Sequence, residues 1–483
     1  MLNKQLRTLF TTGGSLVLVL AISSGLANAA ATLKTLSTNY TLVNLGSAAA
    51  NVSVNYYKED GSAWLAAAES SNFTVGADGG QAIIRQYFDT TMTSGRGSAV
   101  VASDQPLGAV VQILTRGAQV PTYGAYVGSS ETSTVFYVPL VMRLLNGTSS
   151  QIMVQNASTS PVNVTIELTK AAASGGSNYT KSGVTIQAGA TYYYDLSDES
   201  SANVANAWYG SAVVTATGGQ ITVISNLFAG ADQLQTFNGF MPTDLGNKWF
   251  IPLFASRLVN KLSTPVTVQN LSGASIAAGG LTLNCTKEPG TTGSDTIAVS
   301  NSTAVADKES YFFNPVVDTT NLPTDWYGSC VLNSTGNVAV FVQMRQPGAN
   351  VNAAAYEAIN ANGTNQTVLI PLIAKILSNG FATPVTIQNL GNTATTVNIT
   401  YTPGAGCTPS CQTYTENGVS IPANGSLNRN FRLPGTFAQM PSNWFGTMKV
   451  VSSSTPIDGF VQLTTIGAPN GDTLMAHGVF TLP

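Results

Sequence analysis

The residue types that usually perform catalysis or bind metals are scarce in this 483-residue sequence. It contains a single histidine, His477, so no histidine pair can hold a metal or relay a proton. The densest acidic stretch, with Asp195, Asp198 and Glu199, lacks the alternating oxygen ligands of a calcium loop, and we expect a solvated turn there. The sequence has no nucleophile elbow or phosphate-binding loop. We therefore expect a protein that is not an enzyme and needs no cofactor or metal.

The four cysteines indicate disulfides. Cys407 and Cys411 are separated by three residues, which differs from the spacing of redox motifs and would close a small loop. Cys285 and Cys330 fall in the apolar columns of two expected strands of one repeat, which resembles the inter-sheet bridge of immunoglobulin domains. An even number of cysteines in an exported chain favours bridges, so we predict the pairs Cys285–Cys330 and Cys407–Cys411.

Aromatic residues are the remaining candidates for ligand binding, because tryptophan and tyrosine rings can stack on sugars. Three tryptophans recur at one position of a repeated Trp-Tyr/Phe-Gly turn, and this recurrence favours a packing role. Solvent-exposed coplanar rings would favour carbohydrate binding, whereas burial would favour the structural role. The weak candidates are Trp64, Trp208, Trp326, Trp444 and the run of residues 192–194 (Tyr-Tyr-Tyr).

The N-terminus predicts export. Lys4 and Arg7 precede an apolar run at residues 15–22, and Ala27-Asn28-Ala29 offers a cleavage site before Ala30. The apolar run is well short of the ~20 residues that a transmembrane helix needs. We interpret residues 1–29 as a signal peptide and expect an exported mature chain with no membrane span and no covalent anchor.

Internal repetition organises the rest of the chain. The landmarks are an apolar-Pro-Leu element, a Gln-Asn turn and the Trp-Tyr/Phe-Gly turn, which follow one another in the same order. Their copies include Pro139, Pro252 and Pro371, then Asn44, Asn156, Asn270 and Asn389, then Gly97, Gly210, Gly328 and Gly446. We divide the mature chain into four repeats at residues 30–130, 131–246, 247–364 and 365–483.

Each repeat is expected to be all-β. The run after the Gln-Asn turn alternates apolar with Ser, Asn or Thr, as in Val162, Val164 and Ile166, which is typical of a strand with one face in a core and one in water. About seven short strands per repeat match an immunoglobulin-like sandwich better than a barrel or a solenoid. The sequence thus predicts four tandem immunoglobulin-like β-sandwiches in an elongated array.

The first repeat departs from this pattern. Its Pro-Leu element would fall near residue 26, inside the expected signal peptide, so the mature repeat lacks its opening strand. An unpaired sheet edge can pair with another chain, and we hypothesise self-association there; the alternative is that residues 31–38 cover the edge. The loop after the alternating strand differs in each repeat (residues 58–61, 171–183, 287–295 and 407–411), so this end of the repeats is the expected contact surface.

The charge balance excludes one class of partner. Only 9% of residues are charged, and the formal net charge of -3 gives no basic face for nucleic acid. Because charged side chains commonly protect strand edges, their scarcity is compatible with contacts between neutral surfaces.

The landmarks, [FYL]-[VI]-P-L followed by V-Q-N-like turns and a G-S-A-V-V strand, resemble tandem repeats in uncharacterised secreted proteins of filamentous Chloroflexota-type bacteria. The resemblance implies an exported protein of the cell surface or of an appendage and implies no catalytic residue. We therefore expect a structural or adhesive extracellular protein, with copies of itself or cell-surface polysaccharides as partners. The alternative is a carbohydrate-binding protein or an accessory of a secreted hydrolase.

Overall fold

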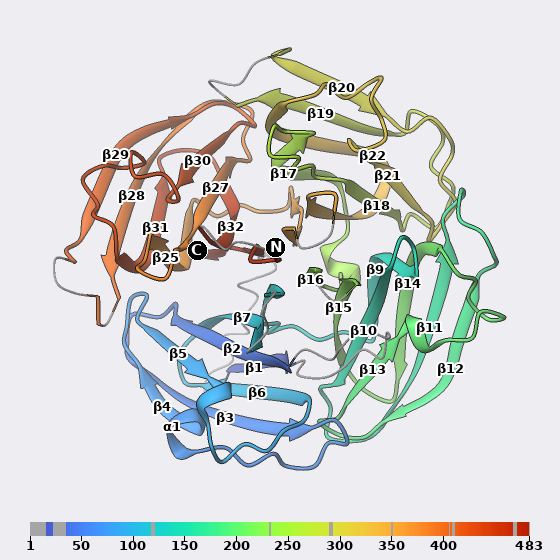
Figure 1. Ribbon diagram of the computed structural model, residues 1–483, viewed down its shortest axis with the longest axis horizontal. Coiled ribbons are helices and arrows are strands. Elements are labelled where there is room, and N and C mark those ends of the chain that lie inside the picture. Colours follow the sequence, from blue (N-terminus) through green and yellow to red (C-terminus); the bar gives the residue numbers. More distant parts are fainter. Residues whose placement is uncertain are drawn as a thin grey trace.

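A computed structural model of the chain describes residues 16–22, 35–116, 121–230, 233–288, 293–348, 351–404, 406–407, 411–466 and 471–482. The described structure is nearly all β, as expected (Figure 1). Its helices are single turns: α1 (Ala68–Ser71), η1 (Gln86–Phe88), η2 (Leu196–Asp198) and η3 (Pro242–Asp244). No helix among these residues is long and apolar enough to span a bilayer.

The strands fall into four sets that follow the repeats. The first set contains β1 (Leu16–Ile22), which precedes repeat 1, and the strands of repeat 1: β2 (Thr35–Asn44), β3 (Ala50–Lys58), β4 (Asn72–Val75), β5 (Gln81–Arg85), β6 (Gly97–Ser103), β7 (Leu107–Arg116) and β8 (Tyr123–Val127). Repeat 2 contains β9 (Val135–Arg143), β10 (Thr148–Asn156), β11 (Val162–Lys170), β12 (Tyr179–Ile186), β13 (Thr191–Asp195), β14 (Trp208–Thr217), β15 (Ile221–Ala229) and β16 (Gln233–Asn238).

Repeats 3 and 4 repeat this order with small changes. Repeat 3 contains β17 (Gly246–Ser256), β18 (Val266–Asn270), β19 (Leu281–Lys287), β20 (Thr296–Ser300), β21 (Ser310–Phe313), β22 (Trp326–Arg345), β23 (Ala353–Glu357) and β24 (Ile359–Asn360). Repeat 4 contains β25 (Thr367–Lys375), β26 (Phe381–Ala382), β27 (Pro384–Asn389), β28 (Thr395–Pro403), β29 (Tyr414–Ile421), β30 (Ser426–Asn430), β31 (Trp444–Ser452), β32 (Ile457–Thr465), β33 (Met475–Gly478) and β34 (Phe480–Leu482).

Each repeat consists of two antiparallel sheets. In repeat 2 the sheets have the orders β12-β11-β14-β9 and β13-β10-β15-β16. The apolar residues of β11 are buried and the residues between them are more exposed, which confirms the alternation read from the sequence. In repeat 3 the long strand β22 belongs to both sheets, since it pairs with β17 and β19 and also with β18 and β23.

Each repeat has one edge strand beside its alternating strand: β12 in repeat 2, with β4, β20 and β29 as its counterparts. These strands lie at sheet edges, and most of their side chains are partly or fully exposed. A strand with little buried surface has no need for apolar alternation, so the sequence carries no periodic signal there.

The expected elongated array is wrong: the four repeats form a ring around one axis (Figure 1). Strands β8, β16, β23 and β33, one from each repeat, meet at this axis. Each contacts the next, and β33 of repeat 4 contacts β8 of repeat 1, which closes the ring.

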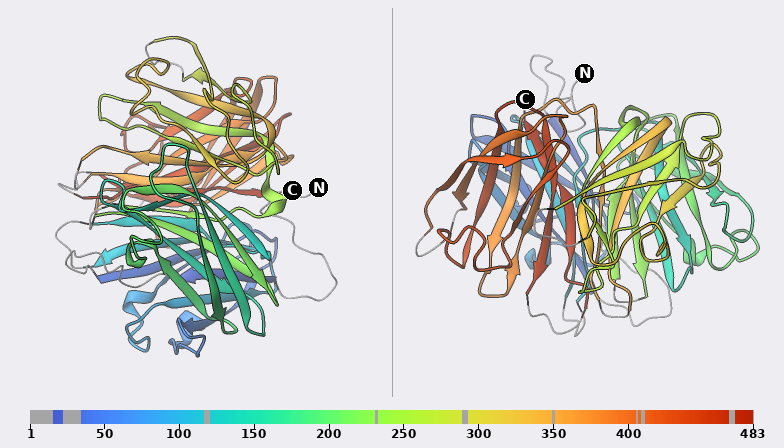
Figure 2. Two further views of the ribbon diagram at one scale, coloured as in Figure 1. Left: turned by 90° about the vertical axis from the view of Figure 1, so that its right-hand side faces the viewer. Right: turned by 90° about the horizontal axis from the view of Figure 1, so that it is seen from above.

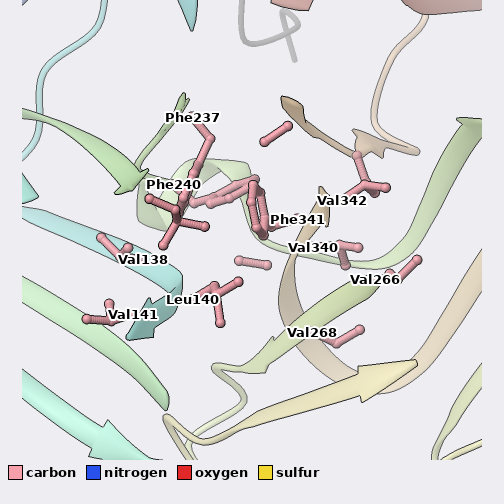
Figure 3. Packing of buried hydrophobic residues seen from close by; sticks show 14 of the residues in the cluster. Val138, Leu140, Val141, Phe237, Phe240, Val266, Val268, Val340, Phe341 and Val342 are labelled. Atoms are coloured by element: carbon pink, nitrogen blue, oxygen red, sulfur yellow. The ribbon is translucent and has the colours of Figure 1, made fainter. Parts of the chain in front are cut away.

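The cores of neighbouring repeats are continuous. Repeats 2 and 3 share one hydrophobic cluster, in which the rings of Phe237 and Phe341 lie 4.0 Å apart between centroids (Figure 3). The clusters of repeats 1 and 4 also each include buried residues of an adjacent repeat, such as Met153 and Ala125. Because buried apolar residues of neighbouring repeats pack against each other, the four repeats form one continuously packed structure.

The repeated landmark residues make hydrogen bonds that hold turns in place and connect neighbouring repeats. The asparagine of each Gln-Asn turn is fully buried, and its Nδ2 donates to a carbonyl four residues ahead, as from Asn156 to Ser160 at 2.8 Å. In repeats 1 to 3 the serine after the landmark glycine donates to the next repeat, from Ser98 to the Gly189 carbonyl at 3.1 Å, from Ser211 to the Lys308 carbonyl, and from Ser329 to the Asn424 carbonyl at 3.1 Å. Buried polar groups require such partners, which explains why these residue types recur.

The proline of the Pro-Leu element lies where the opening strand breaks its register. The pairing of β9, β17 and β25 with their neighbours shifts at Pro139, Pro252 and Pro371 respectively. Proline has no N–H to donate to the ladder, so it is tolerated at a bulge. The freed carbonyl of Pro139 accepts a hydrogen bond from Ser310 of the next repeat at 2.7 Å.

One carboxylate joins all four repeats at the axis. Asp472 is fully buried; its Oδ2 accepts the N–H of Leu234 and its Oδ1 accepts the N–H of Ala353, both at 2.9 Å. Its main chain pairs with repeat 1, since its carbonyl accepts from Tyr123 and its N–H donates to Pro121. Repeat 4 thereby binds repeats 1, 2 and 3 through a single residue.

Both cysteine pairs lie at disulfide distance, with S–S separations of 1.97 Å for Cys285–Cys330 and 1.94 Å for Cys407–Cys411. The comparison of the first pair with an inter-sheet bridge is wrong. Cys285 on β19 and Cys330 on β22 are register partners within one sheet, with Cα atoms 3.9 Å apart. Register partners on adjacent strands point to the same face, so two inward cysteines can bridge without crossing the core.

The opening-strand position of repeat 1 is taken by β1, which belongs to the predicted signal peptide. β1 pairs antiparallel with β6, as β9 pairs with β14 in repeat 2. Residues 35–38 lie in β2 of the other sheet, so they do not cover this edge; residues 31–34 and the predicted cleavage site lie outside the described residues.

We predict that Asp472→Ala lowers the free energy of unfolding by about 4 kcal/mol, because it leaves two buried N–H groups without acceptors. Urea unfolding followed by circular dichroism measures the change. Asp295→Asn is the control, since this carboxylate is exposed and solvent screens its ion pair with Lys287, so we expect little change in stability. A loss below 1 kcal/mol for Asp472→Ala would contradict the role of this residue in ring closure.

The disulfide of repeat 3 replaces a large-small pair of repeat 2, where Leu168 is the register partner of Ala212. We therefore expect the double variant Cys285→Leu/Cys330→Ala to fold and to be more stable than Cys285→Ala/Cys330→Ala by about 2 kcal/mol, because leucine fills the cavity. Thermal unfolding of both variants tests this. Equal stability of the two would show that repeat 3 does not share the packing of repeat 2.

Candidate contact surface and axial pocket

One end of the ring carries most of the variable loops, and we call it the loop face. In repeat 2 the register places Arg143, Lys170 and Trp208 at the same end of one sheet, and Asp195 of the other sheet ends there too. As far as the structure describes them, the loop face is made of residues 144–147, 171–178 and 196–207 in repeat 2. Its counterparts are residues 59–67 and 86–96 in repeat 1 and residues 257–262, 288–295 and 314–325 in repeat 3. In repeat 4 they are residues 376–380, 404–413 and 431–443. It lies opposite the end that carries the C-terminal strand (Figure 2). The structure therefore gathers the loops that the sequence analysis singled out.

Exposed apolar side chains recur at one position of the loop face. The loop after β5, β13, β21 or β30, which we call the fifth strand of the repeat because the short β26 has no counterpart in the other repeats, presents Phe88 in repeat 1, Val317 in repeat 3 and Leu433 in repeat 4. Of their surfaces, 62%, 71% and 55% are exposed. Tyr87 beside Phe88 is 53% exposed, and its ring meets that of Phe88 edge to face. In repeat 2 the corresponding residue is Asp198, which is also exposed. The loop face therefore has an exposed apolar residue at the same position in three of the four repeats.

Buried or half-buried cations hold these loops in place. Arg143, Arg257 and Lys375 lie at the end of the opening strand or directly after it, where they donate to main-chain carbonyls of the loop after the fifth strand. Lys375 is only 2% exposed; its Nζ donates to the carbonyls of Thr436, Phe437 and Met440 at 2.8, 3.0 and 2.7 Å. Burial lowers the pKa of Lys375. Several of the few charges in this chain therefore fix the shape of the loop face.

The candidate tryptophans also support the loops from within. Trp208, Trp326 and Trp444 are fully buried. Each Nε1 donates to a carbonyl of the variable loop that follows β11, β19 or β28, at 3.1, 2.8 and 3.1 Å respectively. In repeat 1 the equivalent position is Gly95, and the ring of Trp64 lies about where a side chain at Gly95 would point. Trp64 is 7% exposed. Their burial favours a structural role for all four tryptophans.

The tyrosine run of residues 192–194 likewise does not present a solvent-exposed aromatic surface for stacking. Tyr193 is 9% exposed and donates to the Gly97 carbonyl of repeat 1 at 2.9 Å. The rings of Tyr192 and Tyr194 stack, but Tyr194 is buried and its hydroxyl donates to Glu199 at 3.0 Å. Tyr193 therefore packs repeat 2 against repeat 1, whereas Tyr194 packs within repeat 2.

The acidic stretch beside this run is a turn that closes on itself. Asp195 Oδ1 accepts the N–H of Ser197 at 2.9 Å, and Glu199 accepts from Asn203 and Lys181. No group of three or more His, Cys, Asp or Glu side chains within the described residues is arranged to hold a metal ion.

A pocket of about 210 Å³ lies on the axis at the end opposite the loop face, with walls from all four repeats. The equivalent positions at the ends of the inner strands are Val127, Asn238, Glu357 and Gly478, so the pocket has four different walls. No Lys, Arg or His is found among its described lining residues, whereas Glu131, Asp244, Glu357 and Asp458 are. Pockets of this kind commonly bind small ligands, but here the carboxylates of Asp244, Glu357 and Asp458 have structural partners.

Those partners are main-chain amides. Glu357 Oε1 accepts the N–H of Asn238 at 2.6 Å, Asp244 Oδ2 accepts that of Met241 at 2.7 Å, and Asp458 Oδ1 accepts that of Gly459 at 2.7 Å. Burial of its carboxyl raises the pKa of Asp458 to about 7. Glu357 therefore connects the end of β23 to the end of β16, whereas Asp244 and Asp458 bind amides within three residues of themselves.

His477 is buried on the neighbouring strand β33. Its Nδ1 lies 2.8 Å from the Gly478 carbonyl, and burial lowers its pKa to about 4, so the ring is neutral at pH 7. The sequence could not indicate Asp472, Asp458 or the cation anchors, because each is a single polar residue whose partners are main-chain groups.

Protein-family models and curated proteins offer no match to this chain, so the interpretation of the site depends on its geometry.

We predict that Asp458→Asn stabilises the protein more at pH 8 than at pH 4. The folded carboxyl binds its proton more tightly than an unfolded aspartate, so wild-type stability decreases as the pH rises from about 4 to about 7. The amide cannot ionise, and the gain at pH 8 should be about 2 kcal/mol after allowance for partial exposure. Thermal unfolding at both pH values measures it.

His477 contributes the opposite slope over the same range, because a buried neutral histidine loses stability as the pH falls from about 6.5 to about 4. The comparison is therefore made between variant and wild type at each pH. Asp78→Asn, in an exposed turn, is the matched control and should leave the profile unchanged. A gain for Asp458→Asn that is the same at pH 4 and pH 8 would contradict the prediction.

Proposed function

We propose that this protein is an exported, non-catalytic structural or adhesive protein of the cell surface or extracellular matrix, and that the loop face makes its contacts. The observation that carries the proposal is the contrast between the recurring residues that connect the repeats and the loops that differ from repeat to repeat. The landmarks that staple the repeats recur, whereas the loops gathered on one face differ between repeats and expose apolar residues at equivalent sites. Rigid scaffolds with variable loops are a common way to build binding surfaces.

Several features support export and a lasting extracellular role. The N-terminal segment has the composition of a signal peptide, and the cysteine pairs suit an oxidising compartment. We further propose that each repeat is a variant of the immunoglobulin-like sandwich, since two antiparallel sheets enclose each core. Such folds host many functions, so the proposal depends on the loop face and not on the fold.

The partner that we propose is a cell-surface component, with polysaccharide as the first to test. Tyr87 and Phe88 offer exposed aromatic surface, and the low charge of the chain suits a neutral partner. The four tryptophans are left out of this role because they are buried.

The test is a loop-face variant with four changes, Tyr87→Ser, Phe88→Ser, Val317→Ser and Leu433→Ser. Because these side chains are exposed, we expect an unfolding temperature within a few degrees of wild type and at least a tenfold loss of retention on cell envelopes of the native organism. Sedimentation with intact envelopes, and with envelopes stripped of protein to leave polysaccharide, measures retention.

The control is Ile83→Ser/Val451→Ser, which changes two exposed apolar residues outside the loop face. Immunogold microscopy of the native organism shows whether the protein resides at the cell exterior. Unchanged retention of the four-residue variant, or an intracellular location, would count against the proposal.

A further inference from the structure

In the described structure, one edge of β6 in repeat 1 pairs with β1, a segment that export would remove. We propose that, once residues 1–29 are cleaved, this edge is a socket for a β-strand donated by a different polypeptide. The inference rests on the proposed export of the chain.

The socket is defined by backbone pairing. β1 runs antiparallel along the whole of β6, from Leu16 opposite Ser103 to Ile22 opposite Gly97. Repeats 2, 3 and 4 fill the same edge with their own opening strands, β9, β17 and β25, which pair with β14, β22 and β31. A strand at this edge is therefore a regular part of the repeat, and a processed first repeat leaves seven residues of ladder without a partner.

The chemistry of the occupant follows from the equivalent strands. β9 is buried along most of its length, with Val138, Leu140 and Val141 fully buried, because it lies between sheets of its own repeat and the next. On β6 itself, Ala99 and Val101 are fully buried. A strand covered on both faces must be apolar throughout, and the sequence of β1, LVLVLAI, meets this requirement. The socket thus fits an extended, uncharged, apolar segment of about seven residues.

A second copy of the chain does not supply this strand. In the described structure, every strand of repeats 2 to 4 is paired within its own repeat, so a processed copy has no strand to give. Direct pairing of two β6 edges is also excluded by position, because the equivalent edges face the ring interior and contact the next repeat. A single strand can enter such a site, whereas the edge of a second folded sheet cannot. The donor is therefore another polypeptide, which replaces the self-association hypothesis for this edge.

The experiment uses the processed chain, residues 30–483, and a synthetic peptide of residues 15–22 with a lysine tail for solubility. We expect binding at one peptide per chain in native mass spectrometry. We also expect a rise of about 2–4 °C in the unfolding temperature at a peptide concentration one hundred times Kd. Hydrogen exchange should slow at the amides of β6.

Two controls make the result specific. The first is the same peptide with Leu18→Pro and Val19→Pro; since alternate residues of an edge strand donate to the neighbour, one of two adjacent prolines must remove a ladder donor. This peptide should not bind. The second is a chain of residues 15–483 with Ala27→Tyr and Ala29→Tyr to prevent cleavage, which carries its own strand and should not bind the peptide.

N-terminal sequencing of the secreted protein separates the two proposals. A chain that begins at Ala30 and binds only the proline-free peptide supports the socket. A chain that begins at Ala30 but binds neither peptide, or both equally, overturns the socket and leaves the proposed export intact. A secreted chain that retains residues 16–22 overturns the socket and also the predicted cleavage, because the repeat then keeps its own strand.

Discussion

The buried carboxylate of Asp472 is the contact on which the shape of the molecule depends. Four repeats can surround an axis only if the last one holds the first, and the inner strands that meet there must also hold one another. Asp472 solves both problems with two oxygens and its own main chain, which bind strands of the other three repeats. Because main-chain amides are its partners, the contact does not need a matching basic residue, and the axis can stay free of charge pairs.

Other charged residues of the ring also bind main-chain groups instead of oppositely charged side chains. Hydrogen bonds from Arg143, Arg257 and Lys375 go to main-chain carbonyls of loops. In the axial pocket, Glu357 and Asp458 accept hydrogen bonds from main-chain N–H groups. A charged group that binds main-chain dipoles avoids much of the penalty of burial without a counter-ion. The 9% of residues that are charged therefore do structural work in the interior as well as on the surface.

The sequence was sufficient for the features that depend on local pattern. Alternation at Val162, Val164 and Ile166 predicts a half-buried strand, and the structure confirms it, as it confirms that both cysteine pairs lie at disulfide distance. The ring could not be predicted, because its contacts come from residues such as Ser98 and Ser329, which look like ordinary polar strand residues in sequence. The cross-strand position of Cys285 and Cys330 was missed for a related reason: inward residues of one sheet and of two facing sheets have the same periodicity.

A closed ring also limits how this protein can change over evolutionary time. An open row of repeats can gain or lose a unit at either end, because each unit contacts only its neighbours. Here each repeat occupies one quarter of a circle, so a fifth copy would require every boundary to change its angle at once. Duplication is therefore blocked after the fourth repeat, and variation is directed into loop sequence, where a change in one quarter leaves the other three undisturbed.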